Sequence, residues 1–561
     1  MYSDKPTINI LTSLLLEHGV RHAVVCPGSR NAPICHNLAS TGKIRCHPMT
    51  DERSAAFFAI GLSQALGMRP VAVCVTSGSA LLDTSPAVAE AFYQRVPLVV
   101  IAADRPAAWI GQLDGQTMPQ PDALGRLALR SASLPMGNTP EELWHANRLI
   151  NEALMDSYMT ARPGPVLINV PLAEPLYEFN TRDLPPTRTC RRIVPTGRDV
   201  ACEVANTLKT RPRRLMVVAG QTGADLEPQL KTLESHRVVV VREPLSSAGS
   251  HPNEAAYILN RRGGTADRYR PDTIVYLGGH LVGKELKRFM RSCTDAETIM
   301  TNAGGEMQDV FQNTTLVAQC GDAVMAETLA ETLGTAADDA SADFFARWEE
   351  LLRLADCACR RQVGTFSQLQ VMQAFDFGAV QYANSSAVRL GCLTARRRFF
   401  CNRGVNGIDG SLSTASGFAT GLEAQSSGPS LVVIGDLSFF YDQNALWNNN
   451  LSPRLRILLL NNGGGGIFSR FRGLEGSPAR ETIVMAAHGM SARGVCGQFG
   501  VEYQLATDLE QTVRHAKWLT ADDARRPRLL EVRTRMDYDQ SALDELYENL
   551  LKEYDERMAP H

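Results

Sequence analysis

The feature that most constrains the fold is an alternation of two patterns along the chain. Short apolar runs rich in Val, Ile and Leu are separated by longer segments with the spacing of amphipathic helices, two of which end at Gly19 and Gly67. In the first third of the chain the apolar runs are HAVVC, VAVCV, VPLVVIAAD and GPVLINV. Buried strands that alternate with helices form βαβ units, in which the strands run parallel. The sequence therefore predicts an α/β fold built on parallel sheets.

This alternation occurs in three blocks, which predict three doubly wound domains at residues 1–180, 200–335 and 345–561. The strands predicted for the second block are LMVVAG, RVVVVREP and DTIVYLGG, and those for the third are PSLVVIGD, RLRILLLNN and RLLEVRT. Segments 175–199 and 334–343 have no periodicity and are predicted to be linkers. A chain of 561 residues is long enough for several domains of about 150 residues each.

Composition excludes several classes of protein. A hydrophobic content of 44% with 21% charged residues is typical of a soluble globular protein, and the formal net charge of -3 creates no strong field for nucleic acid or an anionic membrane. Apolar runs such as 96–103 are far shorter than the roughly 20 residues of a membrane-spanning helix. The first residues carry no signal-peptide pattern. We therefore expect a cytoplasmic protein with no nucleic acid and no membrane as partner.

The cysteines give the same indication about the compartment. There are 13 of them, an odd number, and they are scattered through apolar segments, which favours a reducing environment. Cys357 and Cys359 form the one close pair, and their C-x-C spacing has no second pair nearby. Because a zinc site of the usual kind needs two such pairs, no zinc site is expected here.

Two predicted strands of the third block end in polar residues. Asp436 follows the run PSLVVIG, and Asn462 closes RLRILLLN and is followed by four glycines. Ligands of open parallel sheets bind at the carboxyl ends of the strands. A carboxylate, an amide oxygen and a backbone carbonyl suit a hard cation such as Mg²⁺, and Ser438 begins a turn whose N–H groups could face a phosphate. Each break alone could be an ordinary turn, but the pair favours one metal ion and one diphosphate.

Other phosphate-binding motifs fit less well. The stretch GGHLVGKE, residues 278–285, nearly matches a nucleotide-binding P-loop, but Glu285 stands where that motif needs a hydroxyl and would repel phosphate. The glycine run after Asn462 has no lysine, and no G-x-G-x-x-G follows a predicted strand. A nucleoside triphosphatase and a dinucleotide-binding enzyme are therefore disfavoured.

Several motifs together resemble the thiamine diphosphate (ThDP)-dependent enzymes. They are MTDERSAAFFAIGLSQALG and VTSGSALLDTSPAVAEA in the first block, and GDLSFFYDQNAL followed by NNGGGGIF in the third. The segments VVCPGSRNAP, ADRP and NRGVNGIDGSLSTASG narrow the resemblance to the branch that decarboxylates 2-oxoglutarate and adds the product to isochorismate in menaquinone biosynthesis. The resemblance implies pyrimidine-binding, middle and diphosphate-binding domains. It also implies a homodimer or homotetramer with active sites between chains.

The resemblance assigns cofactor roles to individual residues. It implies that Asp436, Asn462 and the Gly464 carbonyl bind Mg²⁺ or Mn²⁺, that Glu52 faces the aminopyrimidine ring, and that Ile408 holds the cofactor bent. The remaining positions implied around ThDP are Gly435, Leu437, Ser438 and Ile467. Glu52 suits its role independently, because a carboxyl group at the start of an apolar helix can exchange a proton with a ring nitrogen. As an isolated feature it would be an ordinary helix-start acid.

Both implied substrates are dianions, so the site needs several cations. The candidates by motif are Arg30, Arg105, Lys284, Arg389 and Arg403, with Ser29, Gln116 and Ser385 as polar contacts and Phe468 beside Ile467 as a wall of the reactive centre. We expect Arg389 and Arg403 to hold 2-oxoglutarate and the first-block pair to hold isochorismate.

Two features do not fit this interpretation, and two alternatives remain open. Glu285 stands where the branch has a second cation, and four glycines follow Asn462 where the branch has a more mixed sequence. Separately, the run Arg396–Arg398 is expected to be a solvated strand edge. One alternative is another ThDP-dependent 2-oxo acid enzyme, such as an acetolactate synthase or a simple decarboxylase. The other is a non-catalytic ThDP-fold binding subunit, against which the presence of Glu52, Asp436 and Asn462 argues.

Overall fold

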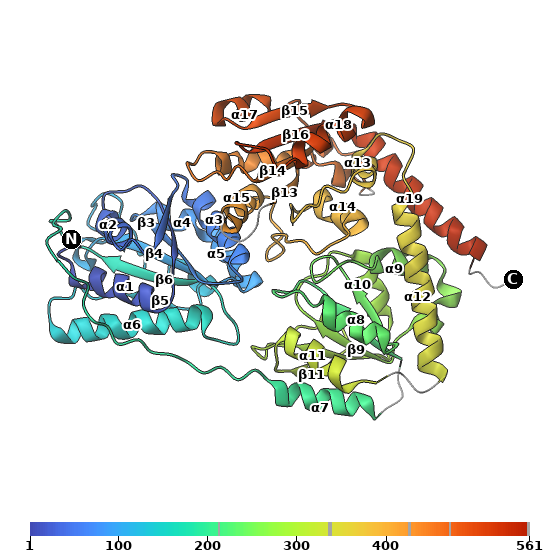
Figure 1. The fold of residues 1–561 in the computed structure, drawn as a ribbon, viewed down its shortest axis with the longest axis horizontal. Helices are drawn as coiled ribbons and strands as arrows, with labels where there is room; N and C mark the ends of the chain where they lie inside the picture. Colours follow the sequence, from blue (N-terminus) through green and yellow to red (C-terminus); the bar gives the residue numbers. More distant parts are fainter. Residues whose placement is uncertain (211–213, 335–338, 424–427, 471–472, 558–561) are drawn as a thin grey trace.

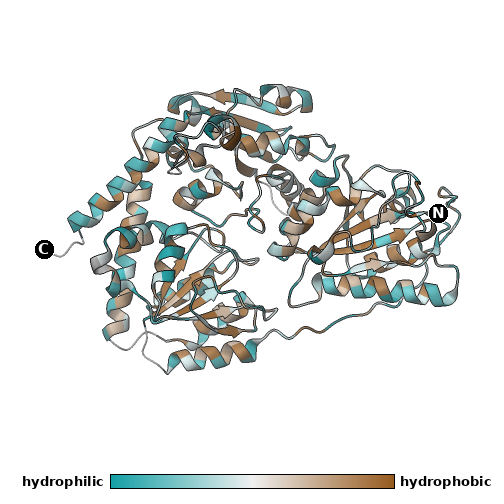
Figure 2. Ribbon diagram, turned by 180° about the vertical axis from the view of Figure 1, so that it is seen from behind, coloured by the Kyte–Doolittle hydropathy of each residue, from teal (hydrophilic) through white to brown (hydrophobic). Residues whose placement is uncertain are grey.

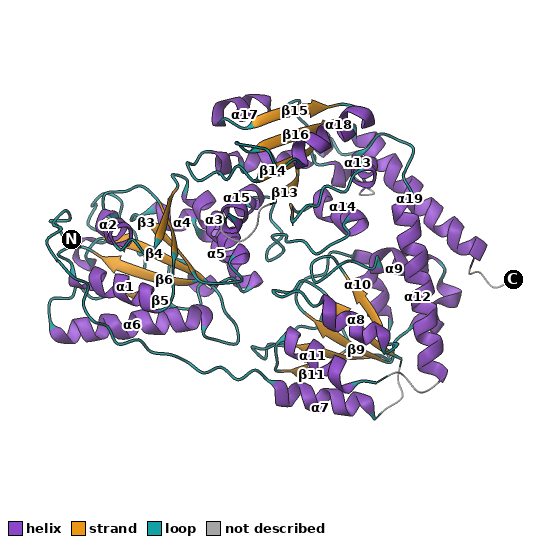
Figure 3. Ribbon diagram, in the orientation of Figure 1, coloured by secondary structure: helices purple, strands orange, loops and turns teal. Residues whose placement is uncertain are grey.

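The structure is a computed structural model that describes residues 1–210, 214–334, 339–423, 428–470 and 473–557. Within these ranges the strands form three sheets, each entirely parallel and each covered by helices (Figures 1 and 3). Hydrophobic residues concentrate on the strands inside each domain, and hydrophilic residues on the outer helix faces (Figure 2). None of the described helices is long and apolar enough to cross a membrane. The predicted α/β fold class is confirmed.

The first domain has a sheet of order β2-β1-β3-β4-β6-β5. Its strands are β1 (His22–Val25), β2 (Arg45–Pro48), β3 (Val71–Val75), β4 (Leu98–Asp104), β5 (Ser131–Ser133) and β6 (Val166–Pro171). Its helices are α1 (Pro6–Glu17), α2 (Ala32–Ser40), α3 (Glu52–Ala65), α4 (Ser79–Asp83), α5 (Ser85–Gln94) and α6 (Pro140–Tyr158). β3 and β4 are buried along their whole length, which explains their continuous apolar sequences.

The middle domain has a sheet of order β11-β10-β9-β7-β8. Its strands are β7 (Leu215–Ala219), β8 (Val239–Arg242), β9 (Thr273–Leu277), β10 (Glu297–Thr301) and β11 (Thr314–Ala318). Its helices are α7 (Arg198–Lys209), α8 (Glu227–Ser235), α9 (Pro252–Arg261), α10 (Lys284–Ser292) and α11 (Asp322–Thr332). A long irregular segment that begins after β6 joins α7 to the first domain (Figure 1).

The third domain has a sheet of order β12-β13-β14-β16-β15. Its strands are β12 (Gln381–Tyr382), β13 (Ser430–Gly435), β14 (Leu455–Asn461), β15 (Glu502–Ala506) and β16 (Arg528–Arg533). Its helices are α13 (Gln368–Ala374), α14 (Ser386–Thr394), α15 (Ser411–Leu422), α16 (Asp436–Tyr441), α17 (Arg493–Phe499), α18 (Leu509–Thr520) and α19 (Met536–Arg557). β13 and β14 are neighbours in register, with Gly435 opposite Leu460, so their carboxyl ends lie side by side.

Two long helices connect the middle and third domains. α12 (Asp339–Arg360) buries Phe344, Trp348 and Leu351 in the core of the middle domain, and the end of α19 adds Leu550 to the same core. The expected linker at 334–343 therefore differs from the structure, because its residues from 339 onward are helical; residues 335–338 lie outside the described ranges. The acid-rich start of this segment concealed a helix whose apolar positions come later.

The first and third domains meet through two helices, α3 and α15, that cross at glycines. A Cβ atom on Gly61 would lie 1.9 Å from the carbonyl oxygen of Thr414, and one on Gly417 would lie 1.9 Å from that of Phe58. The backbones can approach this closely because both positions lack a side chain. The contact fixes α3, which begins at Glu52, against the domain that carries Asp436.

Candidate active site

The two polar strand ends of the third domain form one structure. Asp436 is buried, and one of its carboxylate oxygens accepts hydrogen bonds from the N–H groups of Gly463 (2.8 Å) and Gly464 (2.9 Å). The other oxygen accepts the N–H of Leu437 at 2.7 Å, and Nε2 of His488 lies 3.5 Å from the carboxylate. The loop after β14 is therefore held by the residue that ends β13.

The glycines of this loop are required by its close approach to other backbone segments. Gly464 has φ of 150°, and a Cβ there would lie 2.7 Å from the carbonyl oxygen of Met485. Gly463 has φ of 82°, a conformation that favours glycine. The Gly464 carbonyl accepts the N–H of Gly466 at 2.9 Å, so the loop turns back on itself beyond Asn462.

The amide of Asn462 is oriented by Asp539 of α19. Its Nδ2 donates to a carboxylate oxygen of Asp539 at 2.8 Å, which leaves the amide oxygen as the ligand atom for a cation. Asp539 also accepts the N–H of Gln368 (2.8 Å) and the hydroxyl of Thr534 (3.0 Å), and burial raises its pKa to about 6. Sequence reasoning missed Asp539, because it lies one helix beyond the last strand and belongs to no motif.

The donor set at this loop fits a hard divalent cation. Asp436, Asn462 and the Gly464 carbonyl offer oxygen atoms, the atoms that Mg²⁺ and Mn²⁺ prefer. Burial raises the pKa of Asp436, against the opposing effect of its hydrogen bonds and of His488. A cation would compensate for the burial of this charge. Beside it, Ser438 donates its hydroxyl to the Ile408 carbonyl, which brings the loop of Ile408 to the start of α16.

A cavity of about 380 Å³ opens from this loop toward the middle domain. Asn462, Gly466 and Ile467 line one end of it. α14 contributes Arg389, and the start of α10 contributes Lys284 and Glu285. Three predicted site residues from the two domains therefore share this cavity with Asn462, namely Lys284, Arg389 and Ile467. Phe468 packs against the loop itself, since its ring would lie 2.8 Å from a Cβ on Gly465.

Arg389 and Arg403 are suited to binding an anion. Nη1 of Arg389 donates to the Ser385 carbonyl at 2.9 Å, and Nη1 of Arg403 donates to Oδ1 of Asn384 at 2.9 Å. Burial lowers the pKa of Arg389, and the charge of Arg403 acts in the same direction. Nε of Arg403 is buried without a hydrogen-bond partner among the described residues. Two half-buried cations that repel each other, and whose hydrogen bonds named here go to uncharged oxygens, favour a bound carboxylate.

The middle domain carries a glutamate beside Lys284 and a second lysine three residues further along α10. Glu285 accepts hydrogen bonds from Nδ2 of Asn260 (2.8 Å) and from Arg288 (3.0 Å), so its charge is compensated locally. Lys287, which sequence reasoning missed, is half-buried and close enough to Arg403 for that charge to act on it. Burial lowers the pKa of Lys287, and Glu243 partly opposes this shift.

The candidate residues of the first domain form a separate group. Arg30 donates to Glu174 at 3.1 Å and to the Leu172 carbonyl at 2.9 Å, and Arg105 lies 4.0 Å from the same Glu174 carboxylate. Ser29 lies in the turn before Arg30. Gln116 has φ of 56° and packs on Gly78, and Arg105 donates to the adjacent Gly115 carbonyl at 3.1 Å. The two arginines predicted to act together are therefore neighbours.

Glu52 opens α3 on the same domain. Asp51 caps the helix by accepting the N–H of Ser54 at 2.9 Å. Burial raises the pKa of Glu52, and the carboxylates of Asp83 and Asp51 act in the same direction. Within one chain none of the first-domain candidates lines the 380 Å³ cavity, which is bounded by described residues of the middle and third domains.

The run Arg396–Arg398 is only partly a solvated edge. Arg396 and Arg397 are exposed, as expected. Arg398 is half-buried instead, donates to the carbonyls of Thr222 (2.6 Å) and Gly223 (3.1 Å), and lies over the ring of Phe400. It joins the third domain to the middle one, a contact that no local sequence pattern could show.

Three domains built on parallel sheets, and a loop with candidate metal-ligand oxygens at two neighbouring strand ends, are the features of a thiamine diphosphate-dependent enzyme. Residues 7–125 match the family described as thiamine pyrophosphate enzyme, N-terminal TPP binding domain. The 2-succinyl-5-enolpyruvyl-6-hydroxy-3-cyclohexene-1-carboxylate synthase of Phocaeicola vulgatus is 40% identical over 98% of this chain and 99% of its own length. The synthases of Bacteroides thetaiotaomicron and Desulfotalea psychrophila are 39% and 34% identical, over 98% and 90% of this chain and 100% and 95% of their own lengths. The chain belongs to this synthase family, and its cofactor is ThDP.

Proposed function

We propose that the protein catalyses the ThDP-dependent decarboxylation of 2-oxoglutarate and the addition of the resulting four-carbon unit to isochorismate. The product is 2-succinyl-5-enolpyruvyl-6-hydroxy-3-cyclohexene-1-carboxylate, an intermediate of menaquinone biosynthesis. Membership of the synthase family supports the reaction. The structural observation that supports the substrate choice is Arg389, which lines the cavity beside Asn462 and whose charge is opposed by that of the nearby Arg403.

The residues of the third domain would hold the cofactor. Asp436, Asn462 and the Gly464 carbonyl would bind Mg²⁺ or Mn²⁺, whose charge would attract the diphosphate. Gly435, Leu437 and Ser438 would surround the diphosphate at the start of α16, and Ile408 would support the ring system. When bound, ThDP supplies the carbon centre at which a 2-oxo acid can lose CO₂.

Glu52 would move the proton that activates the cofactor. Its raised pKa keeps the carboxyl group protonated at higher pH than that of a free glutamate, so it can donate a hydrogen bond to a ring nitrogen. Since Glu52 does not line the cavity of its own chain, we propose that a partner chain supplies this residue. The assembly would then be a homodimer or homotetramer in the cytoplasm.

The cations would orient the two dianionic substrates. Arg389 and Arg403, with Ser385 beside them, would hold the carboxylates of 2-oxoglutarate, and Ile467 and Phe468 would exclude water from the reacting carbon. Arg30 and Arg105, with Ser29 and Gln116, would hold isochorismate. Lys284 would complete the site from the middle domain, and Lys287 would supply the positive charge that Glu285 does not.

The test is donor selectivity with purified protein, ThDP and Mg²⁺. We expect CO₂ release from 2-oxoglutarate and little from pyruvate, because only the longer acid has a second carboxylate for the arginine pair. Addition of isochorismate should consume both substrates in equal amounts. Faster turnover of pyruvate would instead identify an acetolactate synthase-like enzyme or a simple decarboxylase, and the absence of turnover with both acids would support a binding subunit.

A further inference from the structure

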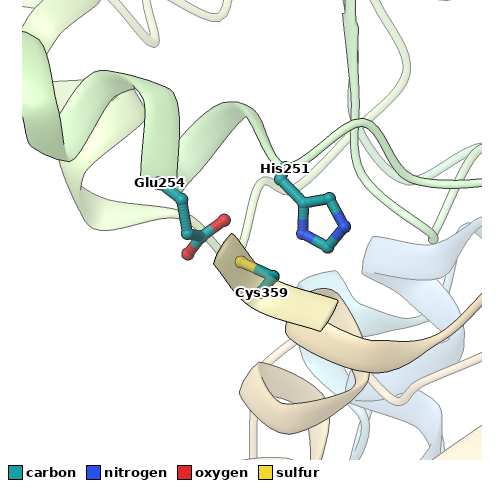
Figure 4. Close-up of side chains that lie close together, drawn as sticks. All are labelled: His251, Glu254 and Cys359. Atoms are coloured by element: carbon teal, nitrogen blue, oxygen red, sulfur yellow. The ribbon is translucent and has the colours of Figure 1, made fainter. Parts of the chain in front are cut away.

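A second group of metal-ligand side chains lies where the middle domain meets α12. His251 immediately precedes α9, Glu254 lies in the first turn of α9, and Cys359 is next to the last residue of α12. Their exposed fractions are 6%, 3% and 1%. One nitrogen, one carboxylate oxygen and one sulfur all lie within 4.8 Å of one another, and Figure 4 shows the three side chains converging. The close approach of these three buried polar side chains needs a physical explanation.

The ring of His251 is oriented for coordination. Its Nε2 lies 3.1 Å from a carboxylate oxygen of Asp356, and since that oxygen can only accept, Nε2 carries a proton. Its Nδ1 is buried and has no hydrogen-bond partner among the described residues. A carboxylate that holds the remote nitrogen of a histidine is the usual outer support of a metal-binding imidazole.

Cys359 and Glu254 lie beside this nitrogen. Burial raises the pKa of the Cys359 thiol, and the charges of Glu254 and Asp356 act in the same direction. The hydrogen bond shown for the Glu254 carboxylate comes from its sequence neighbour, Nδ2 of Asn253, at 2.9 Å. Burial of a carboxylate is costly unless its charge is compensated, which a bound cation would do.

We propose that His251 Nδ1, the Glu254 carboxylate and the Cys359 thiolate bind a zinc ion, separate from the magnesium site at Asp436. Nitrogen, sulfur and oxygen ligands together suit Zn²⁺ and do not suit Mg²⁺ or Ca²⁺. A fourth ligand can be water, because a small cavity of about 40 Å³ is lined by His251 and Cys359.

Zinc binding needs only a small change in the separation of the three ligand atoms. In a tetrahedral zinc site the ligand atoms lie about 3.3–3.8 Å apart, so the donor atoms must approach by roughly 1 Å. We expect rotation of the Cys359 and Glu254 side chains to provide this. Binding releases the thiol proton to solvent, so zinc affinity should rise with pH.

The ion would join the middle domain to the helix that leads into the third domain. Glu254 also lines the 380 Å³ cavity, so the zinc site would lie behind one wall of the active site. The proposal does not depend on the identity of the substrates, because each of its ligands lies outside the groups assigned to substrate or cofactor.

The test uses the full-length protein carrying Asp436→Ala, so that the magnesium ligands cannot contribute. After chelator treatment, incubation with Zn²⁺ and gel filtration, elemental analysis should show about one zinc ion per chain. Cys359→Ser and Glu254→Gln, each added to this background, should weaken zinc binding by about 100-fold or more. The exposed neighbour Cys357 provides the control, and Cys357→Ser should bind zinc as the parent does.

Two further measurements separate coordination from structural damage. Cobalt in place of zinc should give a thiolate charge-transfer absorption that disappears in Cys359→Ser, and zinc should raise the melting temperature of the parent and not of that variant. If Cys359→Ser fails to fold, Glu254→Gln decides the question, since it preserves shape. The absence of retained zinc in the parent, or unchanged zinc affinity in Glu254→Gln, would overturn the proposal.

Discussion

Buried carboxylates that each hold two consecutive backbone N–H groups position the loops of the proposed site. Asp436 holds the loop of the metal ligands in this way. Glu90 accepts the N–H groups of Gly404 (2.6 Å) and Val405 (2.8 Å), directly after Arg403. Glu243 accepts those of Val282 and Gly283, both at 2.7 Å, directly before Lys284. A buried carboxylate holds the backbone of its loop firmly, because hydrogen bonds to a charged acceptor are stronger than those to an uncharged one. Loss of the carboxylate would leave two unsatisfied N–H donors.

Arg389 gives the residue-scale prediction for the donor substrate. Arg389→Ala removes a charge-assisted contact worth about 1.5–3 kcal/mol, so the KM for 2-oxoglutarate should rise roughly 10- to 150-fold. ThDP affinity should not change, since Arg389 is not among the cofactor ligands. Steady-state kinetics and calorimetry measure the two effects.

Arg397 provides the matched control for this prediction. It is exposed and lies 3.7 Å from Asp376, so Arg397→Ala should leave the kinetic constants unchanged. Equal effects of both substitutions, or an unchanged KM in Arg389→Ala, would refute the placement of the donor.

Asp442 gives a pH-dependent prediction. It is buried, accepts the N–H (2.7 Å) and the hydroxyl (2.9 Å) of Ser413, and lies 3.7 Å from Arg53. Burial raises its pKa to about 7, so the folded state favours the protonated acid. The resulting stabilisation is complete below the unfolded pKa of about 3.9 and is lost as the pH rises through 7.

The isosteric variant Asp442→Asn isolates this titration. The free energy of unfolding of the native protein, minus that of the variant, should fall by about 2 kcal/mol between about pH 5.5 and 8. Urea denaturation at constant ionic strength measures it. A difference that does not change with pH would mean that Arg53 and Ser413 outweigh burial and keep Asp442 ionised.

At the scale of elements, the crossing of α3 and α15 depends on Gly61 and Gly417. Gly417→Ala places a methyl group 1.9 Å from the Phe58 carbonyl oxygen, both parts of helix backbones that cannot move independently. The variant should lose about 3 kcal/mol or more of stability, because the two helices must separate. Gly494 of α17 has open space around it, so Gly494→Ala should be neutral or slightly stabilising. Calorimetric melting compares the two variants, and equal melting temperatures would contradict this crossing geometry.

The sequence was most informative about buried strands and their ends. β13 and β14 were predictable because their apolar runs stop at Asp436 and Asn462, and the parallel arrangement brings those ends together. β2, β5, β10, β11, β12 and β15 were missed. The first two are edge strands of four and three residues with one buried residue each. Local periodicity cannot reveal strands this short, since their pairing with longer neighbours determines them.

Residues that meet only in three dimensions were the other limit of sequence reasoning. Asp539 orients Asn462 from 77 positions away. Cys359 lies in a C-x-C pair whose spacing favours no zinc site, yet the structure brings it to His251 and Glu254, about a hundred residues earlier. Neither relation has a spacing rule that a single sequence could show.

At the scale of the whole molecule, the candidate site is divided between two parts of the chain. The first domain carries Glu52, Arg30 and Arg105, and the cavity at the metal loop is lined by the other two domains. Each chain therefore carries both groups of residues, and we propose that each active site combines the first domain of one chain with the middle and third domains of a partner chain.

Glu52→Gln preserves size and hydrogen-bonding reach but cannot exchange the proton, so it should fold, bind ThDP and lose most turnover. Asp436→Ala should lose ThDP, because the metal that bridges to the diphosphate loses a ligand.

Mixing these two variants tests the shared site directly. In a heterodimer of the two variants, one interface would carry both substitutions and the other would carry neither. Two nearly inactive parents that exchange subunits should then recover up to about half of the native activity per heterodimer, if the sites act independently. Subunit exchange is followed separately with an affinity tag on one variant, so that absence of mixing is not mistaken for absence of complementation. If tagged heterodimers form and their activity stays at the level of the parents, each site is built within a single chain, and Glu52 must reach the metal loop by a rearrangement of its own first domain.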